Sequence, residues 1–223
     1  DSVEAVNALF RKVYQFMAVG LILTALAAYL TASSRFMLEL LYTSRAPLLI
    51  LAVAEIGLVI WLSAGINKLS PEGARNIFFV YSIVNGLTMS SVLLVYTGES
   101  VTRAFLSTAG MFAAMSVYGL YTKRDLTGMG SFLRMGLFGL IIAMVINLFM
   151  RSSAMELYIS VFGIIIFLGL TAWDTAKIKA IAESYGNDEA MTGKVAVLGA
   201  LALYLDFVNI FLYLLRLFGR NRD

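Results

Sequence analysis

The sequence predicts an all-α membrane protein with seven transmembrane helices. Of its 223 residues, 60% are hydrophobic and only 14% are charged, and the mean hydropathy is +0.85. This composition is typical of polytopic membrane proteins. No polar stretch is long enough for a separate soluble domain, since the longest interval between apolar runs follows Asp174. We therefore expect one membrane domain over residues 1–223.

Charged residues punctuate the chain and mark the seven helices in order. The apolar runs lie between residues 12 and 35, 45 and 68, 75 and 99, 103 and 123, 134 and 151, 156 and 174, and 194 and 216. A helix needs about 20 apolar residues to cross a hydrocarbon core about 30 Å thick. The fifth and sixth runs are shorter, so we expect them to include neighbouring residues such as 130–133 or to continue past Asp174.

The seventh run carries a single ionisable residue, Asp206, well inside it. The helix between Lys194 and Arg216 is about 31 Å long at a rise of roughly 1.5 Å per residue, which places Asp206 near mid-depth. A carboxylate there costs several kcal/mol, so it should face a partner or a water-filled cavity.

The absence of certain residue types excludes several kinds of chemistry. The chain has no cysteine and no histidine, which excludes disulfides, thiolate chemistry, a serine–histidine hydrolase and nearly every zinc or copper site. We expect no cofactor and no tightly bound metal; any metal must be a hard cation bound by oxygens. The net charge of +3 comes from basic residues at the ends of apolar runs, a pattern typical of membrane-flanking charge rather than of nucleic-acid binding.

The basic residues also predict the orientation in the membrane. Of the 17 lysines and arginines, ten fall on the side of the N-terminus and seven on the other side. By the positive-inside rule, the N-terminus is cytoplasmic and the C-terminus lies outside.

Three acids lie in or beside apolar runs: Glu55, Asp174 and Asp206. From spacing alone, Asp174 can also be a helix-end carboxylate paired with Lys177 or Lys179. Asp206 can also be a buried polar residue bonded to Asn209, one turn later. Helix counting places Glu55 and Asp206 at similar depth and Asp174 closer to the cytoplasmic end.

Asparagines add candidate polar support within the spans. Asn85 and Asn147 are predicted to bond between helices, and Asn209 is the neighbour expected for Asp206.

Three stretches together resemble the Bax inhibitor-1 family, in particular its bacterial branch. They are TKRDL at residues 122–126, LTAWDTAKIK at 170–179 and LYLDFVNIFLYLLRLFG at 203–219. The resemblance covers essentially the whole chain. It implies a seven-helix fold with the last helix at the centre, location in a bacterial inner membrane, and a proton-sensitive calcium leak in which Ca²⁺ is the transported ion.

The resemblance also implies roles for the acids. In that family the aspartates matching Asp174 and Asp206 form a paired pH sensor, and an acid matching Glu55 lines the ion pathway. The physics agrees, because two adjacent carboxylates cannot both ionise cheaply and so share a proton. Oxygen ligands along a pathway are also those that Ca²⁺ prefers.

One departure from the family pattern concerns the second span. Bacterial relatives can carry an arginine there that latches onto the aspartate of the sixth helix, whereas here Lys68 is the nearby cation, displaced by about two residues, and is a weaker partner. A shared proton alone favours a closed pair at low pH. Protonation that breaks a cation latch favours opening, and the resemblance points to this second sign.

The sequence also allows two other classes of function, an interaction protein and an enzyme. An interaction protein that regulates a membrane-integrated AAA+ protease is the alternative, with the short N-terminal tail, Asp1–Phe10, as the handle. An intramembrane aspartyl hydrolase is disfavoured because Asp174 and Asp206 differ in depth and lack a Gly-rich flank. The sequence therefore predicts that the protein is not an enzyme.

Overall fold

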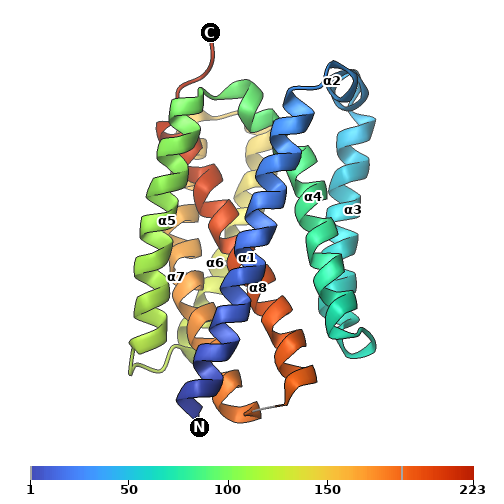
Figure 1. The fold of residues 1–223 in the computed structure, drawn as a ribbon. Helices are drawn as coiled ribbons and strands as arrows, with labels where there is room; N and C mark the ends of the chain where they lie inside the picture. Colours follow the sequence, from blue (N-terminus) through green and yellow to red (C-terminus); the bar gives the residue numbers. More distant parts are fainter. Residues whose placement is uncertain (1, 187) are drawn as a thin grey trace. The chain divides into compact units, whose positions relative to one another are not determined.

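The computed structural model describes residues 2–186 and 188–223, which form helices and connecting turns without a strand (Figure 1). The elements are α1 (Ser2–Ala32), α2 (Arg35–Tyr42), α3 (Ala46–Ala64), the short 3-10 helix η1 (Ile66–Lys68), α4 (Pro71–Val95), α5 (Gly98–Tyr121), α6 (Thr127–Met150), α7 (Ser153–Tyr185) and α8 (Glu189–Phe218).

Seven of these helices, all except α2 and η1, are long and apolar enough to cross a membrane. The predicted all-α fold with seven spans is therefore confirmed. The fifth run does include preceding residues, because α6 begins at Thr127, and the sixth continues past Asp174, because α7 ends at Tyr185. Among the seven spans α8 is the most buried: 67% of its most apolar stretch is buried, against 39% or less in the others. This is expected of a central helix.

The short helix α2 was not predicted. Ser34 caps it, since the Ser34 hydroxyl oxygen accepts a hydrogen bond from the Met37 N–H at 3.3 Å. Leu41 is buried, while Arg35 and Glu39 form an exposed ion pair at 2.9 Å. The segment is far too short to span a bilayer, and its signal was the serine cap before an amphipathic turn.

The helices group into two compact units. The first unit comprises the chain up to Val95 with Ile181–Tyr204 and Arg222, and the second comprises Tyr96–Ala180 with Leu205–Asn221 and Asp223. Helices α7 and α8 contribute residues to both. The single domain predicted over residues 1–223 stays a prediction.

In the first unit, α1 and α4 lie side by side (Figure 1). Gly86 permits their close approach, because a Cβ there would lie 2.5 Å from the carbonyl oxygen of Thr24. The segment expected to be a short free tail is instead part of α1, and its residues Val6, Leu9 and Phe10 are buried. That expectation is wrong for residues 2–10, because their apolar side chains have a core to join.

In the second unit, two glycines allow helices to approach α7. A Cβ on Gly119 of α5 would lie 2.3 Å from the Ala172 carbonyl oxygen, and one on Gly130 of α6 would lie 2.2 Å from the Trp173 indole nitrogen. Small residues at these contacts are typical of membrane helix packing. They fix the part of α7 that carries Asp174.

Candidate functional site

Asp206 lies on α8 among apolar neighbours and is only 4% exposed. Its Oδ2 atom is buried and receives no hydrogen bond from any group in the described chain. A buried carboxylate without donors loses its hydration and gains nothing in return. The residue therefore depends on whatever other polar group reaches it.

That group is Asp174 of α7, whose side chain is half-buried. Within the second unit the side chains of Asp174 and Asp206 lie within hydrogen-bonding reach of each other. An ionised carboxylate only accepts hydrogen bonds, so a bond between these two forms only when one of them carries a proton. The structure thus brings together the two aspartates that the sequence singled out.

Asp174 lies inside a helix, as expected from the continuation past it, because α7 ends at Tyr185. The interaction of its side chain with that of Asp206 brings the two carboxyls close together, although helix counting placed them at different depths. Of the two points against a paired-aspartate hydrolase, the lack of a Gly-rich flank is therefore the one that still applies.

The two lysines proposed as partners of Asp174 make other contacts. The Lys179 ammonium group donates to the Leu120 carbonyl oxygen at 2.9 Å, at the end of α5. Lys177 lies over the Trp173 ring, 5.0 Å from its centroid. Among the described residues, ion pairs within 4.0 Å are formed by Arg35 with Glu39 and by Arg103 with Glu99. Within the described residues, neither lysine therefore forms a salt bridge with Asp174, although the charge of Lys177 still acts on it.

Trp173, next to Asp174, contacts two cations through its ring. The Arg134 guanidinium lies 5.2 Å from the ring centroid, on the ring that also contacts Lys177. Gly130 packs against the same indole. Cation–π contacts of this kind orient an aromatic ring, so they position the turn of α7 that carries Asp174.

Glu55 lies in the first unit, on α3, and is half-buried. The Thr88 hydroxyl of α4 donates to its Oε1 at 2.8 Å. Lys68 lies exposed in η1 and forms no ion pair within the described chain. Its role as a latch stays a prediction.

The three asparagines differ. Asn85 of α4 donates to the Tyr204 hydroxyl of α8 at 2.8 Å, so its predicted interhelical bond is confirmed. Asn209 donates to the Leu205 carbonyl oxygen of its own helix at 2.7 Å, and not to Asp206. The interhelical bond predicted for Asn147 is wrong, because its Oδ1 accepts from the Ser152 N–H at 2.9 Å in the turn after α6.

Tyr204 is the residue that the sequence analysis missed. It is fully buried, two residues before Asp206, and its hydroxyl also lies 2.5 Å from that of Thr24. The available signal was a tyrosine deep inside an apolar run, because a buried hydroxyl needs a partner.

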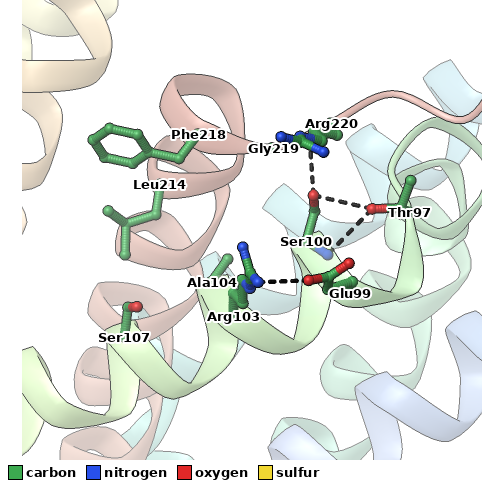
Figure 2. A pocket seen from close by; sticks show the side chains of 10 residues that line it. All are labelled: Thr97, Glu99, Ser100, Arg103, Ala104, Ser107, Leu214, Phe218, Gly219 and Arg220. Atoms are coloured by element: carbon green, nitrogen blue, oxygen red, sulfur yellow. Dashed lines mark hydrogen bonds and ion pairs between the residues drawn. The ribbon is translucent and has the colours of Figure 1, made fainter.

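A cavity of about 380 Å³ lies in the second unit, where α5 begins and α8 ends (Figure 2). Within it Arg103 pairs with Glu99 at 2.6 Å, and the Ser100 hydroxyl oxygen accepts from the backbone N–H of Arg220 at 2.8 Å. None of the site residues predicted from the sequence lines it.

Comparison with known proteins gives the family. The family model described as "Inhibitor of apoptosis-promoting Bax1" matches residues 6–223. The chain belongs to the Bax inhibitor-1 family. An inner membrane protein of Escherichia coli K12, YbhL, is 47% identical over 95% of this chain and 91% of its own length. Uncharacterised proteins of Rickettsia prowazekii and Borreliella burgdorferi are 42% and 40% identical, over 99% and 97% of this chain and 92% and 94% of their own lengths.

Proposed function

We propose that this protein is a pH-sensitive calcium leak channel of a bacterial inner membrane, with Asp174 and Asp206 as its proton sensor. The observation that carries the proposal is the interaction between these two carboxyls, at a buried place where Asp206 Oδ2 has no hydrogen-bond partner in the described chain. The name of the E. coli relative supports the inner membrane as the location.

The sensor works through the charge of the pair. With one proton shared, the two carboxyls attract each other across α7 and α8. Without it, two negative charges stand side by side in a medium of low dielectric constant, which is unfavourable by several kcal/mol. Proton loss therefore favours separation of the two side chains, and this couples pH to the packing of α7 on α8.

Glu55 is the proposed pathway acid. Its carboxylate accepts one hydrogen bond from Thr88 and is half-buried, so it keeps oxygen lone pairs for a passing cation. Ca²⁺ prefers such oxygen ligands and must be bound weakly enough to leave. The proposed orientation has the N-terminus in the cytoplasm and the C-terminus outside.

The test is calcium flux into proteoliposomes loaded with a calcium-sensitive dye, at pH values from about 6 to 8. Wild type should show pH-dependent flux, and Asp206→Asn should lose the dependence. Glu183→Gln, which neutralises an exposed acid on α7, should behave as wild type. Unchanged flux and pH dependence in Asp206→Asn would contradict the sensor.

Whether calcium flux rises or falls with pH tells which interaction closes the channel. If the proton alone holds the pair, flux rises with pH. If a cation such as Lys68 latches onto ionised Asp174, flux rises as pH falls, and Lys68→Gln abolishes that rise.

Regulation of a membrane-integrated AAA+ protease stays the alternative function. It is supported if the protein co-purifies with such a protease, if Asp206→Asn leaves the co-purification unchanged, and if wild type shows no calcium flux.

A further inference from the structure

A second cavity lies in the second unit and has a volume of about 670 Å³. Its wall is apolar and its rim is charged. Its apolar wall includes Ile141, Val145 and Leu148, three residues of α6 in the membrane-spanning stretch. Its charged rim consists of Arg151, Glu156 and Arg216, which lie where α6 ends, α7 begins and α8 ends. An apolar wall with a cationic rim has the two-part chemistry of a phospholipid.

The rim arginines are not neutralised by the protein. Neither Arg151 nor Arg216 forms an ion pair with Glu156 or any other acid of the described chain. With two positive charges and one negative, the rim carries a net positive charge. The cavity of Figure 2 differs, because its Arg103 is paired with Glu99.

Arg216 is held in place by its neighbour. Its guanidinium carbon lies 5.5 Å from the centroid of the Tyr213 ring. That ring is only 4% exposed and packs on Gly163, where a Cβ would lie 2.6 Å away. A buried ring fixes the plane on which the guanidinium stacks, and stacking leaves the N–H donors at the edge of the guanidinium for an anion.

Arg151 occupies an unusual backbone conformation. With φ of +51° it is the one non-glycine residue of the described chain with positive φ, at the position after α6 where glycine or asparagine is usual. The turn is fixed by the Arg151 N–H donating to the Asn147 carbonyl oxygen at 2.8 Å and by the Asn147 side chain bonding Ser152. This fixed turn holds the backbone from which the Arg151 side chain extends at the rim.

The exposed apolar wall and the two arginines together indicate which ligand the cavity can bind. Ile141, Val145 and Leu148 are 47%, 50% and 73% exposed, and an exposed apolar surface at this depth faces acyl chains. Guanidinium groups bind phosphate oxygens through paired N–H donors. We propose that this cavity binds one anionic phospholipid, with its phosphate between Arg151 and Arg216 and an acyl chain along the α6 wall.

The test is native mass spectrometry of the full chain in mild detergent, titrated with palmitoyl-oleoyl phosphatidylglycerol or with phosphatidylcholine of the same acyl chains. Wild type should bind the first phosphatidylglycerol about tenfold more tightly than phosphatidylcholine. The variant Arg151→Gln/Arg216→Gln should lose that preference. Leu148→Trp, which fills the wall without changing the charge, should weaken binding of both lipids.

The control variant is Arg35→Gln/Arg103→Gln, which removes the same charge from two exposed arginines that the protein already pairs. It should keep the preference of wild type. Equal binding of the two lipids by wild type, or an equal loss in the control variant, would overturn the proposal. If Arg151→Gln/Arg216→Gln fails to fold, wild type and Leu148→Trp still test the proposal. Lipid binding by Leu148→Trp that equals that of wild type would refute the acyl-chain site along α6. If millimolar glycerol phosphate displaces phosphatidylglycerol completely, the cavity recognises the phosphate group alone, and the proposal of a bound phospholipid is refuted.

Discussion

Two carboxyls on the membrane-spanning helices differ in their hydrogen-bond partners. Glu55 of the first unit is half-buried and accepts a 2.8 Å hydrogen bond from Thr88. Asp206 of the second unit is 4% exposed, its Oδ2 has no donor in the described chain, and its polar neighbour is another acid. A donor stabilises the ionised form of a carboxyl, whereas a second acid stabilises a state with one proton. In the proposed function, Glu55 is therefore the acid for the cation pathway, and the aspartate pair is the group that exchanges a proton.

The largest expected effect is on calcium flux, when the aspartate pair and Glu55 are mutated separately. Asp174→Asn removes one of the two acids and supplies an amide that can donate to ionised Asp206, so the two carboxyls no longer share a proton. The ratio of calcium fluxes at pH 6 and pH 8 should therefore fall to within about twofold of one. Glu55→Gln keeps an oxygen for the Thr88 bond but removes the charge, so total flux should fall severalfold while the ratio stays. The measurement is the proteoliposome flux described above. A pH ratio lost in Glu55→Gln, or kept in Asp174→Asn, would reverse the assignment.

The next effect concerns the support of the aspartate pair. Gly119→Ala places a Cβ 2.3 Å from the Ala172 carbonyl oxygen, two residues before Asp174, and overpacking of this kind costs about 1–3 kcal/mol of unfolding free energy. We expect a lower Tm in detergent, measured by intrinsic fluorescence. Gly110→Ala on the same helix meets nothing within 4 Å and should leave Tm unchanged or raise it slightly. Equal Tm values for the two variants would show that α5 does not hold α7.

A third effect tests the satisfied polar network of the first unit. Tyr204→Phe removes the hydroxyl that accepts from Asn85 at 2.8 Å and lies 2.5 Å from the Thr24 hydroxyl. Leaving buried groups without a partner costs about 1–2 kcal/mol. A double-mutant cycle of Tm values with Asn85→Ala should show coupling, and the pH ratio of calcium flux should be unchanged. Additive losses would show that the bond contributes nothing to stability.

The smallest effect lies outside the membrane, at the start of α6. The Asp125 Oδ1 atom accepts from the Thr127 N–H at 3.0 Å and from its hydroxyl at 2.6 Å, and these bonds lower the pKa of Asp125 below its ordinary value of 3.8. A lowered pKa in the folded state stabilises the fold above the unfolded value, and this stability is lost as pH falls through the folded value. Asp125→Asn should lower Tm by about 1–2 °C at pH 7 and by less at pH 3. A difference that grows on acidification would contradict this sign.

The sequence predicted the spans and the acids well for a physical reason. Charges cannot be placed cheaply in hydrocarbon, so they mark span ends, and Asp206 stands out inside its run. The continuation of α7 through Lys177 and Lys179 was also expected, and there Trp173 and Leu120 give the ammonium groups contacts. The closeness of Asp174 to Asp206 was not expected from helix counting, because counting residues along each helix does not give the tilt of one helix against another.

Side-chain partners were the least predictable part of the site. Asn147 and Asn209 bond locally, and Tyr204 was overlooked, because each partner depends on the orientation of one helix relative to another. Helical spacing alone does not give that orientation. The unusual backbone at Arg151 was equally hidden, since arginine carries no signal for positive φ.

The most direct test of the central claim is infrared spectroscopy of the full chain across a pH titration, following the C=O stretch of protonated carboxyl groups. If Asp174 and Asp206 share a proton, wild type shows a protonated carboxyl at pH 7, about three units above the ordinary pKa of aspartate. This band should disappear as pH rises and should be absent in Asp206→Asn at pH 7. A wild-type spectrum at pH 7 without a protonated carboxyl, or with one that Asp206→Asn retains, would contradict the account.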